Sequence, residues 1–489
     1  MPQGIVIVGL GPGNPQHLTV EAQQVLAGAR ELYLRTAKHP TVAHLPPHLA
    51  LHAFDHVYEA HDSFDAVYAE IVRQVLALAR RPEGVIYAVP GHPLVGEATV
   101  RRLLEEAEQA VLPVRIVAGL SFVEPVLTAL RLDPLDGLQL LDALELAASH
   151  YPPLDPDRPA LIGQLYSRAL ASDVKLALMN AYPDEHPVTL AIAAGTDAER
   201  LITLPLYELD RRQEVDYLTT LYVPPLPQAG SMGALLEVVG HLRAPDGCPW
   251  DREQTHLSLR QYLLEETYEV LAALDAEDPA ALCEELGDLL LQIVLHAQVA
   301  LEEGEFKWPD VLQHIVAKLR RRHPHVFGEV QVSGAAEVLV NWDRIKREEQ
   351  RDEPAAAAHS LLAKVPAALP ALARAQAMQE RAARVGFDWR DVAGVITKVR
   401  EEVAELQAAA DEARFAELGD LLFALVNLAR WLGIDAEAAL RAATARFAAR
   451  FQEMERLAAA RGVELGDLPL AAQDALWEEA KRRERADTP

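Results

Sequence analysis

The chain has 489 residues, of which 50% are hydrophobic, and a formal net charge of −27. This length exceeds what one hydrophobic core normally serves, so we expect two to four domains. The acidic balance argues against nucleic-acid binding, and the two cysteines exclude a disulfide framework. Because no apolar run approaches the roughly 20 residues that span a bilayer, the sequence predicts a cytoplasmic protein that binds neither nucleic acid nor membrane.

In the first 222 residues, short apolar runs rich in β-branched residues alternate with amphipathic stretches. The amphipathic stretches 19–29 and 64–79 are typical of helices. Strands are expected at 5–8, 85–89, 114–117, 160–165 and 188–193. This alternation predicts an α/β domain with a largely parallel sheet.

Three of these predicted strands end in glycine-containing turns. Their sequences are Gly-Leu-Gly-Pro-Gly at 9–13, Pro-Gly-His-Pro at 90–93 and Ala-Gly-Leu-Ser at 118–121. Taken singly, each is most simply a tight turn between a strand and a helix. Together they predict a ligand crevice, because the carboxyl ends of parallel strands meet at one edge of a sheet and glycine lets a ligand approach the backbone.

These turns resemble those of the tetrapyrrole methylase family, over about residues 1–222. The resemblance implies that S-adenosylmethionine binds between two α/β lobes. His92 departs from the family pattern, in which Asp is common at this position, and this puts cofactor contacts or methyl transfer in doubt. The cofactor-binding residues that the resemblance implies are Gly9, Gly11, Pro12, Gly13, Pro90, Gly91 and Ser121.

The composition of the sequence changes after the proline-rich segment 223–230. This segment has no helical or strand periodicity and is typical of a linker. From residue 231 onward, strand-like runs nearly vanish and long stretches rich in Ala, Leu, Glu and Arg predict helices. The predicted organisation is an α/β domain at 1–222, a linker at 223–230, an all-α bundle at 231–350, a second linker at 351–359 and a second all-α bundle at 360–489.

Both predicted bundles carry the same pattern of acids. Residues three and four apart share a helix face, so the carboxylates stack and repel each other by roughly 0.2–0.5 kcal/mol per pair. One such cluster is usually only a solvated face. The repetition, and the apolar residues around the aspartates, predict acids at the edge of a core that hold a cation. The acids are Glu265, Glu266, Glu269, Glu285 and Asp288 in the first copy, and Glu401, Glu402, Glu405, Glu417 and Asp420 in the second.

Basic and aromatic residues follow the acids in the same order in both copies. Mg²⁺ takes only one or two carboxylates per ion and keeps water or substrate phosphates, so each cluster could hold two or more ions. Basic residues would meet phosphates, and Trp could stack on a base. The pattern therefore predicts a nucleotide polyphosphate site, twice, and hydrolysis of a phosphoanhydride. The residues are Lys318, Arg322, Trp342 and Lys346, then Arg446, Arg450, Trp477 and Lys481.

Five motifs, at 247–251, 264–270, 285–288, 321–328 and 341–342, resemble the MazG family of nucleoside triphosphate pyrophosphohydrolases. The resemblance covers about residues 231–489 in two tandem copies. It implies conversion of nucleoside triphosphates to monophosphates and pyrophosphate with Mg²⁺ or Mn²⁺, in control of the nucleotide pool, by an intertwined homodimer. It also implies that Glu266, Glu269, Glu285 and Asp288, and Glu402, Glu405, Glu417 and Asp420, are metal ligands and catalytic residues, with the basic and Trp residues around the nucleotide.

Which copy is active stays open. In tandem members of the family the C-terminal copy tends to be the active one, but Arg446 stands where Lys is usual, whereas the first copy keeps Lys318. Arg does not replace the point charge of Lys. The alternative function is an S-adenosylmethionine-dependent methyltransferase whose repeats serve dimerisation or nucleotide sensing.

Overall fold

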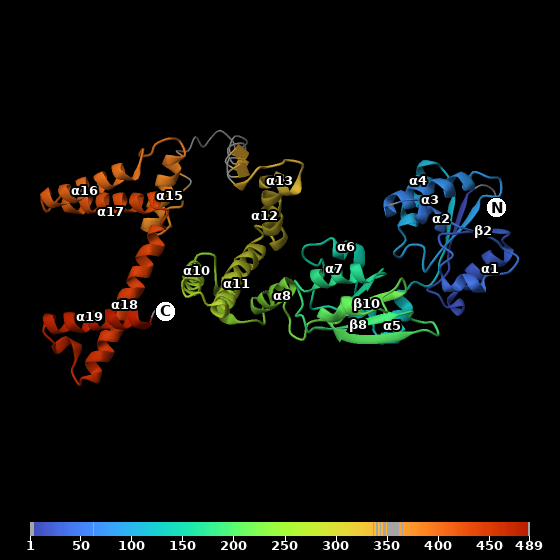
Figure 1. The fold of residues 1–489 in the computed structure, drawn as a ribbon, viewed down its shortest axis with the longest axis horizontal. Helices are drawn as coiled ribbons and strands as arrows, with labels where there is room; N and C mark the ends of the chain where they lie inside the picture. The colour runs from blue at the N-terminus through green and yellow to red at the C-terminus, as the bar shows by residue number, and fades with distance from the viewer. Residues whose placement is uncertain are drawn as a thin grey trace. The chain divides into compact units, whose positions relative to one another are not determined.

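The computed structural model describes residues 4–487, except 62, 336, 339–340, 343, 346–348, 350–360 and 364 (Figure 1). The predicted linker 351–359 and the predicted nucleotide-binding residue Lys346 lie outside the described residues. The chain forms two compact units. One comprises Met1–Leu259 with Leu291–Val299, and the other comprises Arg260–Leu290 with Ala300–Pro489.

The first sheet is parallel throughout, with the strand order β3-β2-β4-β1-β5. Its inner strand β1, between β4 and β5, is buried at every position, and alternate residues enter two different cores. Ile5 and Ile7 pack in the core that includes α3 and α4, whereas Val6 and Val8 pack in the core that includes α1. The elements are β1 Ile5–Gly9, α1 Val20–Gly28, β2 Glu31–Leu34, β3 Ala50–Ala53, α2 Asp55–Ala60, α3 Phe64–Ala79, β4 Val85–Val89, α4 Ala98–Gln109 and β5 Val114–Val117.

The second sheet is mixed, with the order β6-β7-β10-β8-β9. Only β6 and β7 pair in parallel, and the other three pairs are antiparallel. The prediction of a largely parallel sheet is therefore confirmed for the first sheet and wrong for the second, where β8 turns back directly into β9. The elements are α5 Val123–Leu130, β6 Gln139–Asp142, α6 Ala143–Ala147, β7 Ala160–Gly163, α7 Arg168–Leu178, β8 Pro187–Ile192, β9 Arg200–Pro205 and β10 Thr219–Val223.

The predicted linker 223–230 begins with Val223, the last residue of β10, and its other residues form no helix or strand. It is held against the domain before it. The carboxylate of Asp157 accepts hydrogen bonds from the backbone N–H of Gly230 at 2.8 Å and of Ser231 at 3.0 Å. The N–H of Leu226 donates to the carbonyl of Pro156 at 2.9 Å. This segment is thus an anchored connection within the described structure.

Helices account for all regular structure described after Val223, as the composition predicts. In Figure 1, α16 and α17 run side by side. The helices are α8 Met232–Leu242, α9 Pro249–Glu253, α10 Arg260–Asp275, α11 Pro279–Glu303, α12 Trp308–Arg322, α13 Pro324–Phe327, α15 Ala371–Ala383, α16 Val392–Ala408, α17 Arg414–Trp431, α18 Ala436–Ala460 and α19 Leu470–Asp487. Among the described residues, none of the helices combines the length and apolar character needed to cross a membrane.

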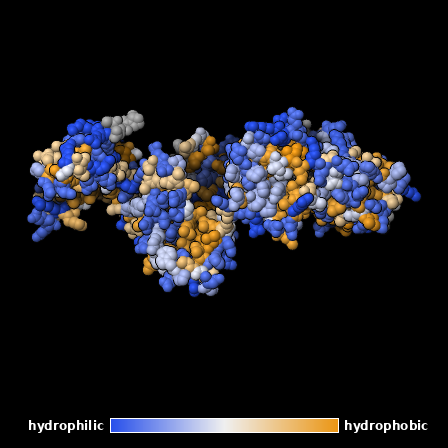
Figure 2. All heavy atoms as spheres, turned by 90° about the horizontal axis from the view of Figure 1, so that it is seen from below, coloured by the Kyte–Doolittle hydropathy of each residue, from blue (hydrophilic) through white to orange (hydrophobic). Residues whose placement is uncertain are grey.

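The helical half leaves large apolar side chains exposed. Leu286 on α11 is 49% exposed, and Leu422 and Phe423 on α17 are each 47% exposed. Figure 2 shows hydrophobic patches (orange) between hydrophilic regions (blue) of the surface. A single chain therefore leaves part of the apolar surface of these helices exposed, although other apolar residues of α11 and α17 are buried.

The three glycine-containing turns meet at the carboxyl ends of β1, β4 and β5. The N–H of Gly91 donates to the carbonyl of Gly11 at 2.8 Å. A Cβ added to Gly9 would lie 2.6 Å from the oxygen of Gly91 and 2.7 Å from the nitrogen of Gly119. Glycine is required at position 9 because two other backbone segments occupy the space of a side chain.

We expect Gly9→Ala to separate these turns and to destabilise the first unit by several kcal/mol, since backbone atoms cannot yield as side chains do. Gly28→Ala is the matched control, because nothing lies within 4 Å of its added Cβ and alanine favours a helix by roughly 0.5–1 kcal/mol. Thermal unfolding should show opposite shifts. A Gly9→Ala protein as stable as the unmodified chain would contradict the tight packing of the turns.

Candidate functional site: two acidic clusters and an interlobe cavity

The first acidic cluster lies between α10 and α11. Oxygen atoms of Glu266, Glu269 and Glu285 all lie within 4.8 Å of one another. Partial burial, a hydrogen bond with Glu269 and the charge of Asp288 raise the pKa of Glu266. Burial and the charge of Glu269 likewise raise the pKa of Glu285. The cluster therefore holds more negative charge than the chain itself compensates.

The second cluster lies between α16 and α17, where oxygen atoms of Glu402, Glu405 and Glu417 also lie within 4.8 Å of one another. Glu402 is only 5% exposed, and its Oε2 has no hydrogen-bond partner among the described residues. Burial raises the pKa of Glu405; the charge of Lys398 opposes this shift, and that of Glu402 adds to it. A buried carboxylate oxygen without a partner is costly unless a cation binds it.

Lys398 supplies part of the compensating charge in the second cluster. Its Nζ lies 2.7 Å from Glu401 and 2.8 Å from Glu402. Sequence reasoning missed this residue, although its spacing of three and four residues from the two acids is a readable signal for an ion pair on a helix. The corresponding position in the first copy is Tyr262.

Divalent cations fit both clusters. Carboxylate oxygens are the ligands that Mg²⁺ and Mn²⁺ prefer, and each cluster converges three of them from two helices. The predicted fourth acids, Asp288 and Asp420, follow one turn after Glu285 and Glu417 but are exposed. The expectation that these aspartates lie at the edge of a core is wrong for the single chain, because the apolar side chains beside them are exposed as well.

The basic and aromatic residues of the second copy group together on α18 and α19. Arg450 pairs with Glu484 at 2.7 Å, and its guanidinium lies 5.7 Å from the ring centre of Trp477. Lys481 pairs with Glu478 at 2.8 Å. Arg446 is exposed.

The first copy shows a similar grouping. Arg322 pairs with Glu349 at 2.6 Å, and the ring of Trp342 meets the ring of His323 edge-on at 5.1 Å. Lys318 is exposed. The structure thus brings together three acids of each copy. Arg322, Arg450 and Lys481 form their ion pairs with other acids, Glu349, Glu484 and Glu478, and not with these clusters. Sequence reasoning missed Glu349 and Glu484, whose pairing depends on tertiary contacts.

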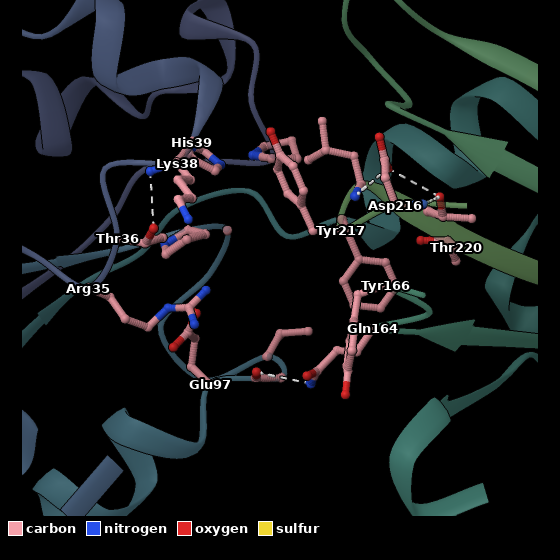
Figure 3. Close-up of a pocket in the computed structure, with 18 of the residues that line it drawn as sticks. Arg35, Thr36, Lys38, His39, Glu97, Gln164, Tyr166, Asp216, Tyr217 and Thr220 are labelled. Carbon is pink, nitrogen blue, oxygen red and sulfur yellow. Dashed lines mark hydrogen bonds and ion pairs between the residues drawn. The ribbon is translucent and has the colours of Figure 1, made fainter. Parts of the chain in front are cut away.

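In the first unit, a cavity of about 720 Å³ opens between the loops of the two sheets (Figure 3). Three of the predicted cofactor residues, Pro12, Pro90 and Gly91, line it. Ser121 is buried, and its hydroxyl donates to Glu124 at 2.6 Å, so this side chain organises the start of α5. The other predicted cofactor residues, Gly9, Gly11 and Gly13, shape the turn behind the lining.

Both the N-terminal α/β region and the helical region of the chain are similar to known proteins. The model of tetrapyrrole (corrin/porphyrin) methylases matches residues 4–210, and the MazG nucleotide pyrophosphohydrolase domain matches residues 254–327. An uncharacterized protein of Bacillus subtilis (strain 168), YabN, is 43% identical over 98% of this chain and 99% of its own length. A nucleoside triphosphate pyrophosphohydrolase of Escherichia coli (strain K12) is 49% identical over 51% of this chain and 97% of its own length. The chain belongs to the MazG family.

This MazG protein therefore carries an N-terminal tetrapyrrole methylase domain followed by a helical MazG region. Part of the chain also resembles the crystal structure of a uroporphyrin-III-C-methyltransferase from Thermus thermophilus. That similarity has a TM-score of 0.36 and 22% sequence identity, and it covers 46% of this chain and 93% of that one.

Removing the charge of Lys398 should strengthen cation binding at the second cluster, because its ammonium group competes for Glu402. We expect Lys398→Met to raise Mn²⁺ affinity about two- to fivefold, the effect of one partly exposed ion pair. Calorimetric titration of the full chain, with Glu266→Gln silencing the first cluster, measures this directly. Arg400→Met, which removes an exposed base from the same helix, is the control. A weaker affinity in Lys398→Met would instead make Lys398 a support for the ligands.

The repulsion within the first cluster should appear as a stability cost without metal. Because the folded-state pKa of Glu266 is raised, its favourable contribution is complete at low pH and is lost as pH rises through that pKa. In chelator at neutral pH, Glu266→Gln should therefore stabilise the protein by roughly 0.2–1 kcal/mol. The gain should shrink near the ordinary glutamate pKa. Thermal unfolding at both pH values tests this, with Glu329→Gln as a control, and a destabilised Glu266→Gln at neutral pH would contradict it.

Proposed function

We propose that this MazG protein hydrolyses nucleoside triphosphates to monophosphates and pyrophosphate in control of the nucleotide pool, using Mg²⁺ or Mn²⁺. One observation supports this above the others. The buried Oε2 of Glu402 has no hydrogen-bond partner among the described residues, and the same side chain converges with Glu405 and Glu417. The Escherichia coli relative is named for this activity.

In this proposal the acids hold the metal and the basic groups hold the substrate. Glu402, Glu405, Glu417 and Asp420 would be the ligands in the second copy, and Glu266, Glu269, Glu285 and Asp288 in the first. A bound divalent ion supplies charge neutralisation for the polyphosphate and lowers the pKa of bound water. Arg450, held over Trp477, would exchange its bond with Glu484 for phosphate oxygens, and Arg446 and Lys481 would add charge beside it. Lys318, Arg322, Trp342 and Lys346 would serve the first copy.

We further propose that the active form is a homodimer built through the helical domains. Part of the apolar surface of α11 and α17 is exposed in one chain, with Leu286, Leu422 and Phe423 about half exposed. Burying such faces contributes about 25 cal/mol per Å². A second copy offers the same faces and is the simplest partner.

The proposed domains are 1–222, 231–350 and 360–489. In support, β10 ends at Val223 and α8 begins at Met232. A second function, S-adenosylmethionine binding by the first domain, is favoured by the cavity that Pro12, Pro90 and Gly91 line. The alternative, a methyltransferase whose helical repeats serve only dimerisation or nucleotide sensing, has no comparable observation at the acids. The cytoplasmic location stays a prediction.

Pyrophosphate release from nucleoside triphosphates by the full chain, with and without Mg²⁺, tests the main proposal. We expect Glu402→Ala to lose at least about tenfold more activity than Glu266→Ala, because Glu402 is the more deeply buried of the two and its loss leaves a ligand position that water cannot replace. Glu329→Ala is the control. Equal losses would show that both copies turn over. Unchanged activity in both variants, or no release with any nucleoside triphosphate, would refute the proposal.

A further inference from the structure

The cavity of the first unit extends well beyond the predicted cofactor turns. Besides Pro12, Pro90 and Gly91, it is lined by residues from the loops of both sheets. In Figure 3, Arg35, Lys38 and His39 stand on one side and Gln164, Tyr166 and Thr220 stand across from them. A cavity of about 720 Å³ is in the range that encloses a small organic molecule.

Aromatic side chains are enriched in the lining of this cavity. Of its 30 lining residues, six are Phe or Tyr, whereas aromatic residues make up 6% of the chain. Phe64 stacks on Tyr68 with ring centres 5.9 Å apart and meets the ring of Tyr166 nearly perpendicularly at 6.2 Å. Burial raises the pKa of Tyr68 to about 12, so its phenol stays neutral. We call Tyr58, Phe64, Tyr68, Phe122, Tyr166 and Tyr217 the aromatic wall.

The charged groups of the cavity do not favour an anion. The basic side chains are those of Arg35 and Lys38, and the acidic ones are those of Asp55, Glu59, Glu97 and Asp216. Arg35 lies 3.1 Å from Glu97, whose side chain is 6% exposed, and donates a hydrogen bond to the hydroxyl of Tyr58 at 3.1 Å. The charge of Arg35 is therefore balanced by an acid of the chain, although its Nε has no hydrogen-bond partner among the described residues, and Lys38 is the other base of the lining.

His39 offers the cavity a neutral hydrogen-bonding group. It is 8% exposed, and its Nδ1 has no hydrogen-bond partner among the described residues. Burial, and then the charge of Arg35, lower its pKa to about 4, so the imidazole is uncharged at neutral pH. A buried polar atom without a hydrogen-bond partner is costly. A ligand that forms a hydrogen bond with Nδ1 of His39 would remove that cost.

These features disagree with a polycarboxylate ligand. Porphyrin-type tetrapyrroles carry many carboxylates and need free basic side chains, whereas this cavity has more acids than bases and pairs Arg35 internally. Tyrosine faces attract cations and stack with flat rings. We propose that the cavity binds, beside the cofactor turns, a planar aromatic or heteroaromatic molecule without net negative charge, and not a polycarboxylate tetrapyrrole. The inference depends on the proposed function only in treating those turns as the cofactor site.

The test compares three probes on the full chain by calorimetry, with and without saturating S-adenosylhomocysteine. Tryptamine and indole-3-propionate share one ring system but have opposite charges, and uroporphyrin III is the polycarboxylate. We expect tryptamine to bind at least about tenfold more tightly than indole-3-propionate, as a cation over tyrosines beside acids should. Equal or tighter binding of indole-3-propionate or of uroporphyrin III would overturn the proposal.

Displacement of tryptamine by S-adenosylhomocysteine would also overturn the proposal, because it would reduce the aromatic wall to part of the cofactor site. If S-adenosylhomocysteine does not bind by itself, the cofactor assignment fails. The comparison of the three probes still decides the present inference in that case.

Two variants tie the selectivity to named residues. Glu97→Gln frees Arg35 and should shift the preference about tenfold towards indole-3-propionate; an unchanged preference would contradict the role of the ion pair. Since this variant leaves a buried charge unpaired and could fail to fold, Tyr166→Leu serves as a second probe. It should weaken tryptamine binding about tenfold, and unchanged binding would remove the aromatic wall from the site. Tyr151→Leu is its control, because Tyr151 is an exposed tyrosine outside the cavity lining.

Discussion

Crowding of carboxylates between paired helices is the constraint on which the helical half depends. Both clusters converge three glutamates to within 4.8 Å. The described residues compensate this charge only in part. In the first cluster the pKa values of Glu266 and Glu285 are raised. In the second cluster Lys398 forms an ion pair with Glu402. A ligand that binds only the folded state stabilises it by mass action. A cation bound at these clusters would therefore add to the stability of the helical domains.

Burial explains only part of how well the sequence predicted the strands: the largely buried β10 was missed, whereas the partly exposed β5 was predicted. The strand Ile5–Gly9 is buried at every position, and its apolar run was readable. The strand Ala50–Ala53 lies at the sheet edge with mostly exposed residues, so it carries no hydrophobic pattern and was missed. Strand direction was not readable either. Most residues of β8 and β10 are buried, as in the parallel strands, yet these two strands pair antiparallel, because pairing depends on distant segments rather than on local composition.

The same distinction applies to the sites. The grouping of Glu402 with Glu405 follows from helical periodicity alone, so it could be predicted from the sequence without knowing how the helices pack. The partner of Arg450 could not be predicted in this way, since Glu484 lies on another helix. For Asp420 the apolar neighbours predicted a core edge, but Leu422 is 47% exposed in the chain. The apolar residues beside Asp420 therefore mark a surface that is exposed in a single chain and not a core.

One rule connects the two halves of the molecule: the balance of the charges gathered at a site decides which ligand charge the site favours. Lys398 pairs with Glu402 at 2.8 Å, but three glutamates converge there, and Oε2 of Glu402 keeps no hydrogen-bond partner among the described residues. A cation would supply the missing charge. The Nε of Arg35 likewise has no hydrogen-bond partner among the described residues, but Glu97 lies 3.1 Å away and acids outnumber bases in the cavity lining. Removing Glu97 would leave the charge of Arg35 without this counterion and favour an anion. The charge preference of each site thus follows from its local charges, rather than from the net charge of −27 that both share.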